Sequence, residues 1–114
     1  MKNLGQQAED LAAAFLQRQG LIIVERNFRV RGGEIDLVAR HGSTLVFVEV
    51  RLRSRADFGG AAASITAQKQ ARLIRAAEHY LLRFSTLPPC RFDALLLEEL
   101  DGGRIEWLRD AFRS

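Results

Sequence analysis

Asp36 and Glu49 are the two residues whose type and spacing best suit a divalent cation. The segments 34–40 and 44–53 alternate between apolar and polar residues and flank the dipeptide Gly42-Ser43, a pattern that predicts a β-hairpin. With a two-residue turn, Asp36 lies directly opposite Glu49, where like charges repel at a Cβ separation of about 4.5–5.5 Å. A cation between the carboxylates would remove this repulsion, and Mg²⁺ favours one or two carboxylates with waters and a phosphate oxygen. Such a site could activate water against a phosphodiester.

The same register places a second charged pair beside these carboxylates. Glu34 falls opposite Arg51, on the face of Asp36 and Glu49, because side chains along a strand alternate with period 2. Two alternatives to a metal site stay open. Glu34 and Arg51 form a plain ion pair, worth under about 1 kcal/mol if exposed, while both acids point into water; or a longer loop shifts the register. The other face is expected to be core throughout; it carries Ile35, Leu37, Ala39, Val46, Val48, Val50 and Leu52.

The hairpin is one part of a chain predicted to fold in the order α-β-β-β-α-β-β. Apolar residues recur at helical spacing in residues 4–19 and in about 64–84, and both patterns predict amphipathic helices. Residues 54–63 are expected to form a loop, and 101–103 a turn. The predicted strands are 21–25, 34–40, 44–53, 91–98 and about 105–108. A single α/β domain over 1–114, with one mixed central sheet and helices on its faces, is the natural packing.

Composition excludes several classes of protein. Of the 114 residues, 47% are apolar and 27% are charged, which is typical of a globular domain and not of a disordered chain. The apolar stretches are only a few residues long, whereas a transmembrane helix needs about 20, so no membrane partner is expected. The N-terminus has no signal-peptide pattern. The single cysteine, Cys90, forms no internal disulfide and fits a cytoplasmic location.

Basic residues gather in the middle of the chain. Residues 26–55 carry a net charge of +4 and residues 56–91 of +3, whereas residues 92–114 carry −3. A basic zone of this kind fits the footprint of a polyanion, and nucleic acid is the expected partner. The alternative is an ordinary solvated face of charged residues. The candidate phosphate contacts are Arg53 and Arg55 after the hairpin and Lys69, Arg72 and Arg75 on the second helix.

Four longer motifs run through the sequence: GEIDLVAR at 33–40, LVFVEVRLRS at 45–54, FGGAAASITAQKQARL at 58–73 and RFDALLLE at 91–98. Together they resemble the YraN family of uncharacterised bacterial proteins over nearly the whole chain. That family is similar to the restriction-endonuclease-like superfamily, which includes the archaeal Holliday-junction resolvases. The resemblance therefore implies a restriction-endonuclease-like fold. It also implies an endonuclease that uses Mg²⁺ or Mn²⁺ to hydrolyse phosphodiester bonds in DNA, including branched or damaged DNA.

The resemblance also implies roles for single residues. Asp36 resembles the metal-binding aspartate and Glu49 the second carboxylate, with the carbonyl of Val50 as a further metal ligand. Glu9 matches a first-helix glutamate that completes the catalytic site in the resolvase-like branch. Arg51 departs from the superfamily pattern, which has a lysine there. Arginine can hold a phosphate or a water but cannot give up a proton at working pH.

The departure at Arg51 leaves more than one function open. The chain is either a nuclease or a nucleic-acid-binding protein with the nuclease fold and little or no catalysis. A third reading is a small interaction protein without a polyanion partner. Lys69 is either a substitute amine or an exposed helix lysine. Cutting both strands of a duplex would require two sites, and hence a homodimer, on which the sequence is silent.

Other polar residues are interpreted as structural. Arg91 and Asp93 alternate along a predicted strand and are expected to form an ion-paired strand face. Trp107 is expected to pack in the core or at a sheet edge rather than to stack on bases. His41 has no partner at metal-ligand spacing and is also interpreted as structural.

Overall fold

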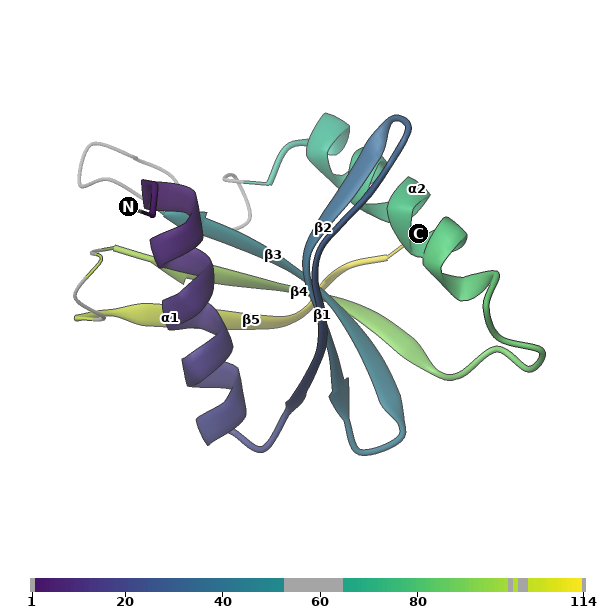
Figure 1. Ribbon diagram of the computed structural model, residues 1–114, viewed down its shortest axis with the longest axis horizontal. Helices are drawn as coiled ribbons and strands as arrows, with labels where there is room; N and C mark the ends of the chain where they lie inside the picture. Colours follow the sequence, from purple (N-terminus) through teal and green to yellow (C-terminus); the bar gives the residue numbers. More distant parts are fainter. Residues whose placement is uncertain (1, 53–64, 99, 101–102, 114) are drawn as a thin grey trace.

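The computed structural model describes residues 2–52, 65–98, 100 and 103–113 (Figure 1). The described elements follow the predicted order and form an α/β fold of two helices and five strands. They are α1 (Leu4–Arg18), β1 (Ile22–Val30), β2 (Gly33–His41), β3 (Thr44–Leu52), α2 (Ala67–Leu81), β4 (Cys90–Leu97) and β5 (Ile105–Phe112). The predicted loop at 54–63 and most of the predicted turn at 101–103 lie outside the described residues. Neither helix has the length and apolar character needed to cross a membrane, within the part of the chain described.

The strands form one mixed sheet in the order β1-β2-β3-β4-β5, in which β3 and β4 are parallel and the other neighbours are antiparallel. The β2–β3 pairing starts at His41 and Thr44, so the predicted two-residue turn and its register are confirmed. The pairing ends at Leu37 and Val48. Beyond that point β2 stays paired with β1, and Figure 1 shows this hairpin swinging away from β3 toward α2. The sheet therefore forks next to Asp36.

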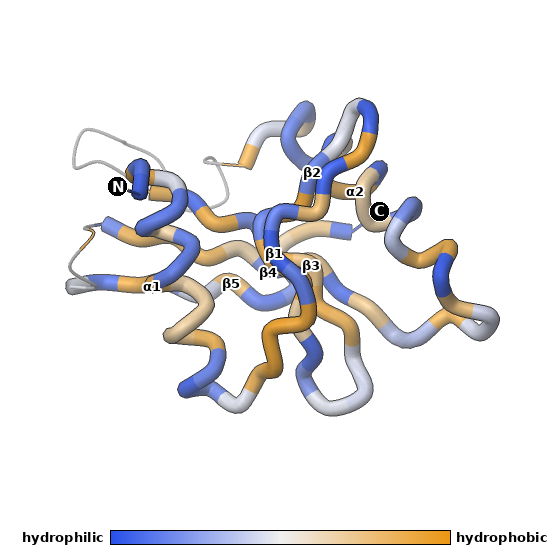
Figure 2. Tube along the Cα trace, viewed as in Figure 1, coloured by the Kyte–Doolittle hydropathy of each residue, from blue (hydrophilic) through white to orange (hydrophobic). Residues whose placement is uncertain are grey.

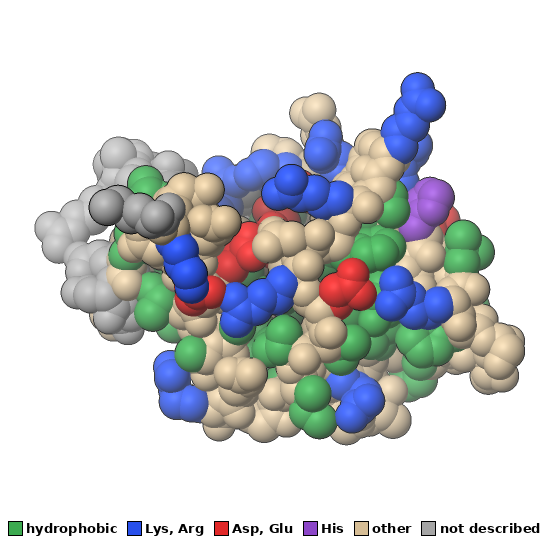
Figure 3. Space-filling model, viewed as in Figure 1, with side chains coloured by type: hydrophobic (Ala, Val, Ile, Leu, Met, Phe, Trp, Pro, Cys, Tyr) green, Lys and Arg blue, Asp and Glu red, His purple; other side chains and the backbone are tan. Residues whose placement is uncertain are grey.

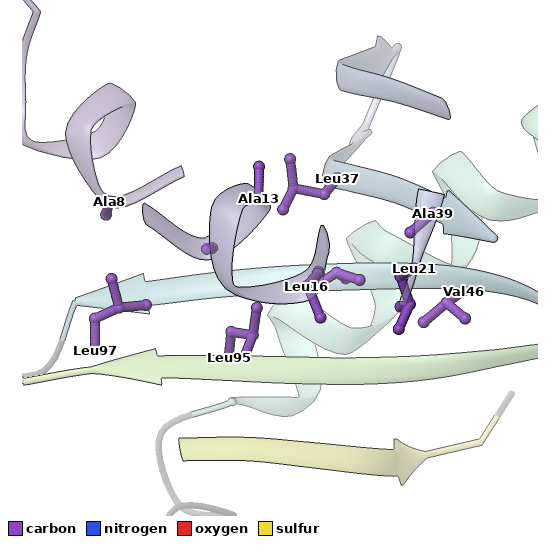
Figure 4. Close-up of a cluster of buried hydrophobic side chains, with 11 residues drawn as sticks. Ala8, Ala13, Leu16, Leu21, Leu37, Ala39, Val46, Leu95 and Leu97 are labelled. Atoms are coloured by element: carbon purple, nitrogen blue, oxygen red, sulfur yellow. The ribbon is translucent and has the colours of Figure 1, made fainter. Parts of the chain in front are cut away.

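Helix α1 covers one face of the sheet through small and apolar side chains. Its first turn is closed by a capping box, in which the Asn3 side chain accepts from the Gln6 amide and the Gln6 side chain accepts from the Asn3 amide. Gly20, with a φ of +92°, follows the helix and turns the chain back toward the sheet. Figure 2 shows hydrophobic and hydrophilic residues alternating along α1, and Figure 4 shows the buried ones facing the sheet. This layer contains Ala8, Ala12, Ala13, Leu16, Leu21, Leu37, Ala39, Val46, Val48, Leu95 and Leu97.

Helix α2 covers the opposite face. Thr66 caps it by accepting from the Lys69 amide at 3.1 Å. The buried side chains of this layer are Ile35, Val38, Leu45, Phe47, Leu73, Ala76, Ala77, Tyr80 and Phe92. Ile35 was expected on the α1 face with Leu37, and that expectation is wrong because β2 bends at Asp36, where it leaves β3. Leu52, also expected in the core, is 38% exposed.

Both edge strands are longer than the sequence pattern predicts. β1 continues to Val30 instead of ending at residue 25, and β5 continues to Phe112 instead of ending near 108. Each contains a break in register, between Ile23 and Glu25 in β1 and opposite Phe92 to Ala94 in β5. A bulge inserts an unpaired residue and interrupts the alternation of apolar and polar side chains, so the period-2 signal is lost there.

Gly33 brings the start of β2 against the backbone of α2. A Cβ atom at this position would lie 2.4 Å from the carbonyl oxygen of Arg72 and 3.0 Å from the amide of Ala76. Gly33→Ala is therefore expected to lower the free energy of unfolding by about 1–3 kcal/mol, the usual cost of overpacking, in urea denaturation. Gly5→Ala is the control, because a Cβ there meets only Asn3 Oδ1 at 3.4 Å. Equal stability of the two variants would contradict the backbone contact.

Candidate metal centre

The carboxylates of Asp36 and Glu49 meet at the fork of the sheet. Both side chains are half-buried, and a hydrogen bond between them raises the pKa of Asp36 and lowers that of Glu49. Asp36 Oδ2 also accepts from the Val50 amide at 2.8 Å, which joins the two strands beyond their last ladder pair. The predicted meeting of the two acids is thus found.

Burial makes it costly for both acids to be charged at once. Desolvation, followed by the charge of Glu49, raises the pKa of Asp36 to about 7. Desolvation also raises the pKa of Glu49, against the opposing effects of Lys69 and of the Asp36 hydrogen bond. A proton shared by the two carboxylates would relieve this repulsion, and a divalent cation would relieve it in the same place.

The donor set suits a hard cation with few protein ligands. No group of three or more His, Cys, Asp and Glu side chains suited to a metal ion occurs among the residues that the structure describes. Asp36 and Glu49 would therefore be the side-chain ligands, with water and phosphate oxygens completing the sphere, as Mg²⁺ prefers. The Val50 amide is engaged by Asp36, whereas the role of the Val50 carbonyl stays a prediction.

Glu9 on α1 is a third acid close to this pair. Burial raises the pKa of Glu9 most, and the negative charge of Asp36 has the next largest effect in the same direction. Asn27 Nδ2 donates to Glu9 Oε1 at 2.9 Å and so holds the carboxylate between α1 and β1. The register of β1 and β2 places Asn27 opposite Asp36, and its φ of +54° is left-handed. Sequence reasoning missed Asn27, although asparagine is among the few residues that tolerate this conformation.

Arg51 lies beside Glu49 on β3. Its positive charge lowers the pKa of Glu49. Its Nε is buried and finds no hydrogen-bond acceptor among the residues described. The alternative of a plain ion pair between Glu34 and Arg51 is not found: Glu34 contacts Arg29 at 3.6 Å, because β2 has left β3 by this point and is paired with β1.

A pocket of about 440 Å³ opens beside the carboxylate pair, between β2, β3 and α2. Glu49 contributes one acidic wall, and the positive charge of Lys69 lowers the pKa of this carboxylate more than that of Arg51 does. The lining residues are Glu34, Glu49, Thr66, Gln68, Lys69 and Arg72. On the face in Figure 3, acidic side chains lie between α1 and the β1–β2 hairpin, with Lys and Arg side chains around them.

The predicted phosphate contacts divide into three groups. Lys69 and Arg72 line the pocket. Arg75 lies over the β1–β2 turn, where its guanidinium packs near Gly32. Arg53 and Arg55 lie outside the described residues. The structure thus brings two of the five candidates to the carboxylate pair.

A second polar cluster surrounds Asp93 on β4. The predicted ion pair is confirmed, with Arg91 Nε at 3.0 Å from Asp93 Oδ1, and Asp93 is fully buried. Its carboxylate also accepts from Trp107 Nε1 at 3.0 Å and from the Asp110 amide at 2.9 Å. Arg91 donates in turn to His41 Nδ1 at 3.0 Å. Every one of these contacts is internal, so the cluster fastens β5 to β4.

Comparison with known proteins shows the family of the chain. Residues 8–97 match the description "Uncharacterised protein family UPF0102". A UPF0102 protein of Methylobacillus flagellatus is 58% identical, covering 98% of each chain. A UPF0102 protein of Cupriavidus metallidurans is 62% identical over 95% of this chain and 79% of its own length. The chain therefore belongs to the uncharacterised protein family UPF0102, the YraN family that its motifs resemble.

Proposed function

We propose that this protein is a metal-dependent nuclease that hydrolyses phosphodiester bonds in DNA. The observation that supports the proposal most directly is the hydrogen-bonded pair of Asp36 and Glu49, half-buried at the fork of the sheet and open to a pocket with a basic wall. Two carboxylates that compete for one proton are a ready site for Mg²⁺ or Mn²⁺. The basic wall suits the phosphate of the substrate.

The proposed reaction is a hydrolysis. The oxygen of a water molecule forms a bond to phosphorus while the bond from phosphorus to one sugar oxygen breaks. The water gives a proton to a nearby carboxylate or to solvent, and the leaving oxygen takes one up, so that a phosphomonoester and a free hydroxyl result. A bound divalent cation would lower the pKa of water and offset charge on the phosphate. Glu9, whose pKa is raised, is suited to accept the proton.

The proposal includes a restriction-endonuclease-like fold. The mixed sheet, the parallel β3–β4 pair joined through α2, and acids from α1, β2 and β3 gathered at one fork support it. A fold hosts many functions, so the argument for hydrolysis rests on the carboxylates.

A nucleic-acid-binding protein without turnover is the second candidate, and Arg51 is the observation that favours it. Arg51 stands where a lysine would be expected in an active nuclease of this kind, and its Nε has no acceptor among the described residues. In this case binding to DNA would weaken steeply with salt through counterion release, and no metal would support cleavage. Filter binding at low salt that retains neither DNA nor RNA would exclude both candidates.

Glu49→Gln is expected to slow cleavage at least about 100-fold, because it removes one of the two charged ligands and leaves the volume of the side chain unchanged. The measurement is single-turnover cleavage of linear, nicked and branched DNA in Mg²⁺ and in Mn²⁺.

Glu78→Gln is the matched control, since Glu78 is exposed near the end of α2 and is not among the residues that line the pocket. Cutting by Glu49→Gln at the native rate would exclude this carboxylate from the reaction.

A further inference from the structure

Lys69 and Arg72 present two cations to the carboxylate pair from across the pocket. They lie three residues apart on α2, so both side chains project from the same side of the helix. In the described part of the chain neither is paired with a carboxylate, unlike Arg29, whose partner is Glu34. No salt bridge to either is found among those residues, and Lys69 acts on Glu49 only through its charge across the pocket, so both groups can contact an anion that enters between them.

The pocket has one acidic and one basic wall, which restricts the ligand that it can take. A free anion would be repelled by Glu49 and Glu34, and a free cation by Lys69 and Arg72. A phosphate that carries a divalent cation satisfies both walls, because the cation faces the carboxylates and the remaining phosphate oxygens face α2. A volume of about 440 Å³ is sufficient for a nucleotide unit.

We propose that the α2 wall of this pocket is the phosphate subsite of the protein, in which Lys69 contacts the phosphate under attack and Arg72 the same phosphate or the next one along the strand. The inference rests on the proposed function and adds to it the residues that bind the reacting phosphate. The compact ammonium group of Lys69 stabilises the negative charge on the phosphate oxygens. Lys69 performs this role instead of Arg51. Arg75 has no part in the subsite, because it packs over Gly32.

The binding arm of the test uses the dinucleotide thymidylyl-thymidine, which contains a single phosphodiester, together with Mg²⁺. Titration followed by amide resonances in NMR is expected to shift residues 66–72 and Glu49. Lys69→Ala is expected to weaken this binding at least about tenfold, and Lys69→Arg to restore most of it. Arg18→Ala is the control, since it removes a positive charge from the last turn of α1. Absence of shifts in α2 would overturn the proposal.

The kinetic arm separates the subsite from the proposed function. Lys69→Ala is expected to lower kcat on DNA by about 10²–10³, the usual effect of removing one charge-stabilising donor, with a much smaller change in KM. If the native chain cuts DNA and Lys69→Ala cuts it as fast as Arg18→Ala, the subsite is wrong and the nuclease proposal stands. If the native chain cuts nothing but binds the dinucleotide through Lys69, the subsite stands and the hydrolytic proposal fails.

Discussion

Asp36→Asn is expected to make the metal-free chain more stable at pH 8 while it abolishes cleavage of DNA. The pKa of Asp36 is about 7 in the folded chain, against an ordinary value of 3.8. A carboxyl whose pKa is raised by folding binds its proton more tightly in the folded state, so the folded state loses stability as the pH rises from about 4 through 7. Asparagine carries no charge at any pH in this range, and its Oδ1 can still accept a hydrogen bond from the Val50 amide.

The expected gain grows with pH. One unit of pKa shift corresponds to about 1.4 kcal/mol, so between pH 5 and pH 8 the advantage of Asp36→Asn should increase by roughly 1–3 kcal/mol. The measurement is urea denaturation in EDTA at each pH. Mn²⁺ added at pH 8 should raise the midpoint of the native chain but not that of the variant, because a ligand that binds only the folded state stabilises it.

Asp10→Asn is the matched control for this experiment. Asp10 is exposed, and hydrogen bonds from Lys2 and Arg26 lower its pKa. Loss of its charge should therefore give no gain at pH 8. A stabilisation that is the same for both variants, or that does not grow with pH, would show that Asp36 is not held near its partner acid.

Asp93→Ala is expected to lower the free energy of unfolding by about 3–5 kcal/mol, the usual cost of removing one partner from a buried charge pair. The substitution leaves the half-buried Arg91 guanidinium without its carboxylate, and the indole N–H of Trp107 without an acceptor. It also removes the acceptor of the Asp110 amide, inside the irregular part of β5. Urea denaturation measures the loss, and hydrogen exchange is expected to show β5 opening first.

Two variants sharpen this prediction. Asp93→Asn keeps an acceptor oxygen and should cost less than Asp93→Ala. Asp110→Asn removes only the exposed ion pair with Arg113 at 2.9 Å, and asparagine accepts the left-handed φ of +51° at this position. A cost below about 1 kcal/mol for Asp93→Ala would mean that β5 is held by its ladder and apolar contacts alone.

The hairpin and its acids could be predicted because local rules determine them. Strict alternation in 34–40 and 44–53 specifies which side chains share a face, and a two-residue turn specifies which residues are opposed. Together these rules brought Asp36 to Glu49, as the structure confirms. The two helices were predictable for the same reason, since apolar spacing and capping residues are read along one segment.

The rest depends on contacts between distant segments. β2 bends where it leaves β3. This bend places Ile35 on the α2 face and brings Glu34 into contact with Arg29. The sequence of β2 alone contains no residue that indicates where the bend occurs. The Asp93 cluster joins three strands, so its burial is invisible in the pattern around residue 93. The role of Asn27 depends on α1 passing over β1.

The contact at Gly33 determines how far apart the two walls of the pocket stand. β2 carries Glu34 directly after Gly33, and α2 carries Arg72, whose own carbonyl is the atom nearest to an added Cβ. Main chain meets main chain there, so no rotamer can lengthen or shorten the clearance. Any side chain added at residue 33 would push the two main chains apart and so widen the aperture between Glu34 and Arg72.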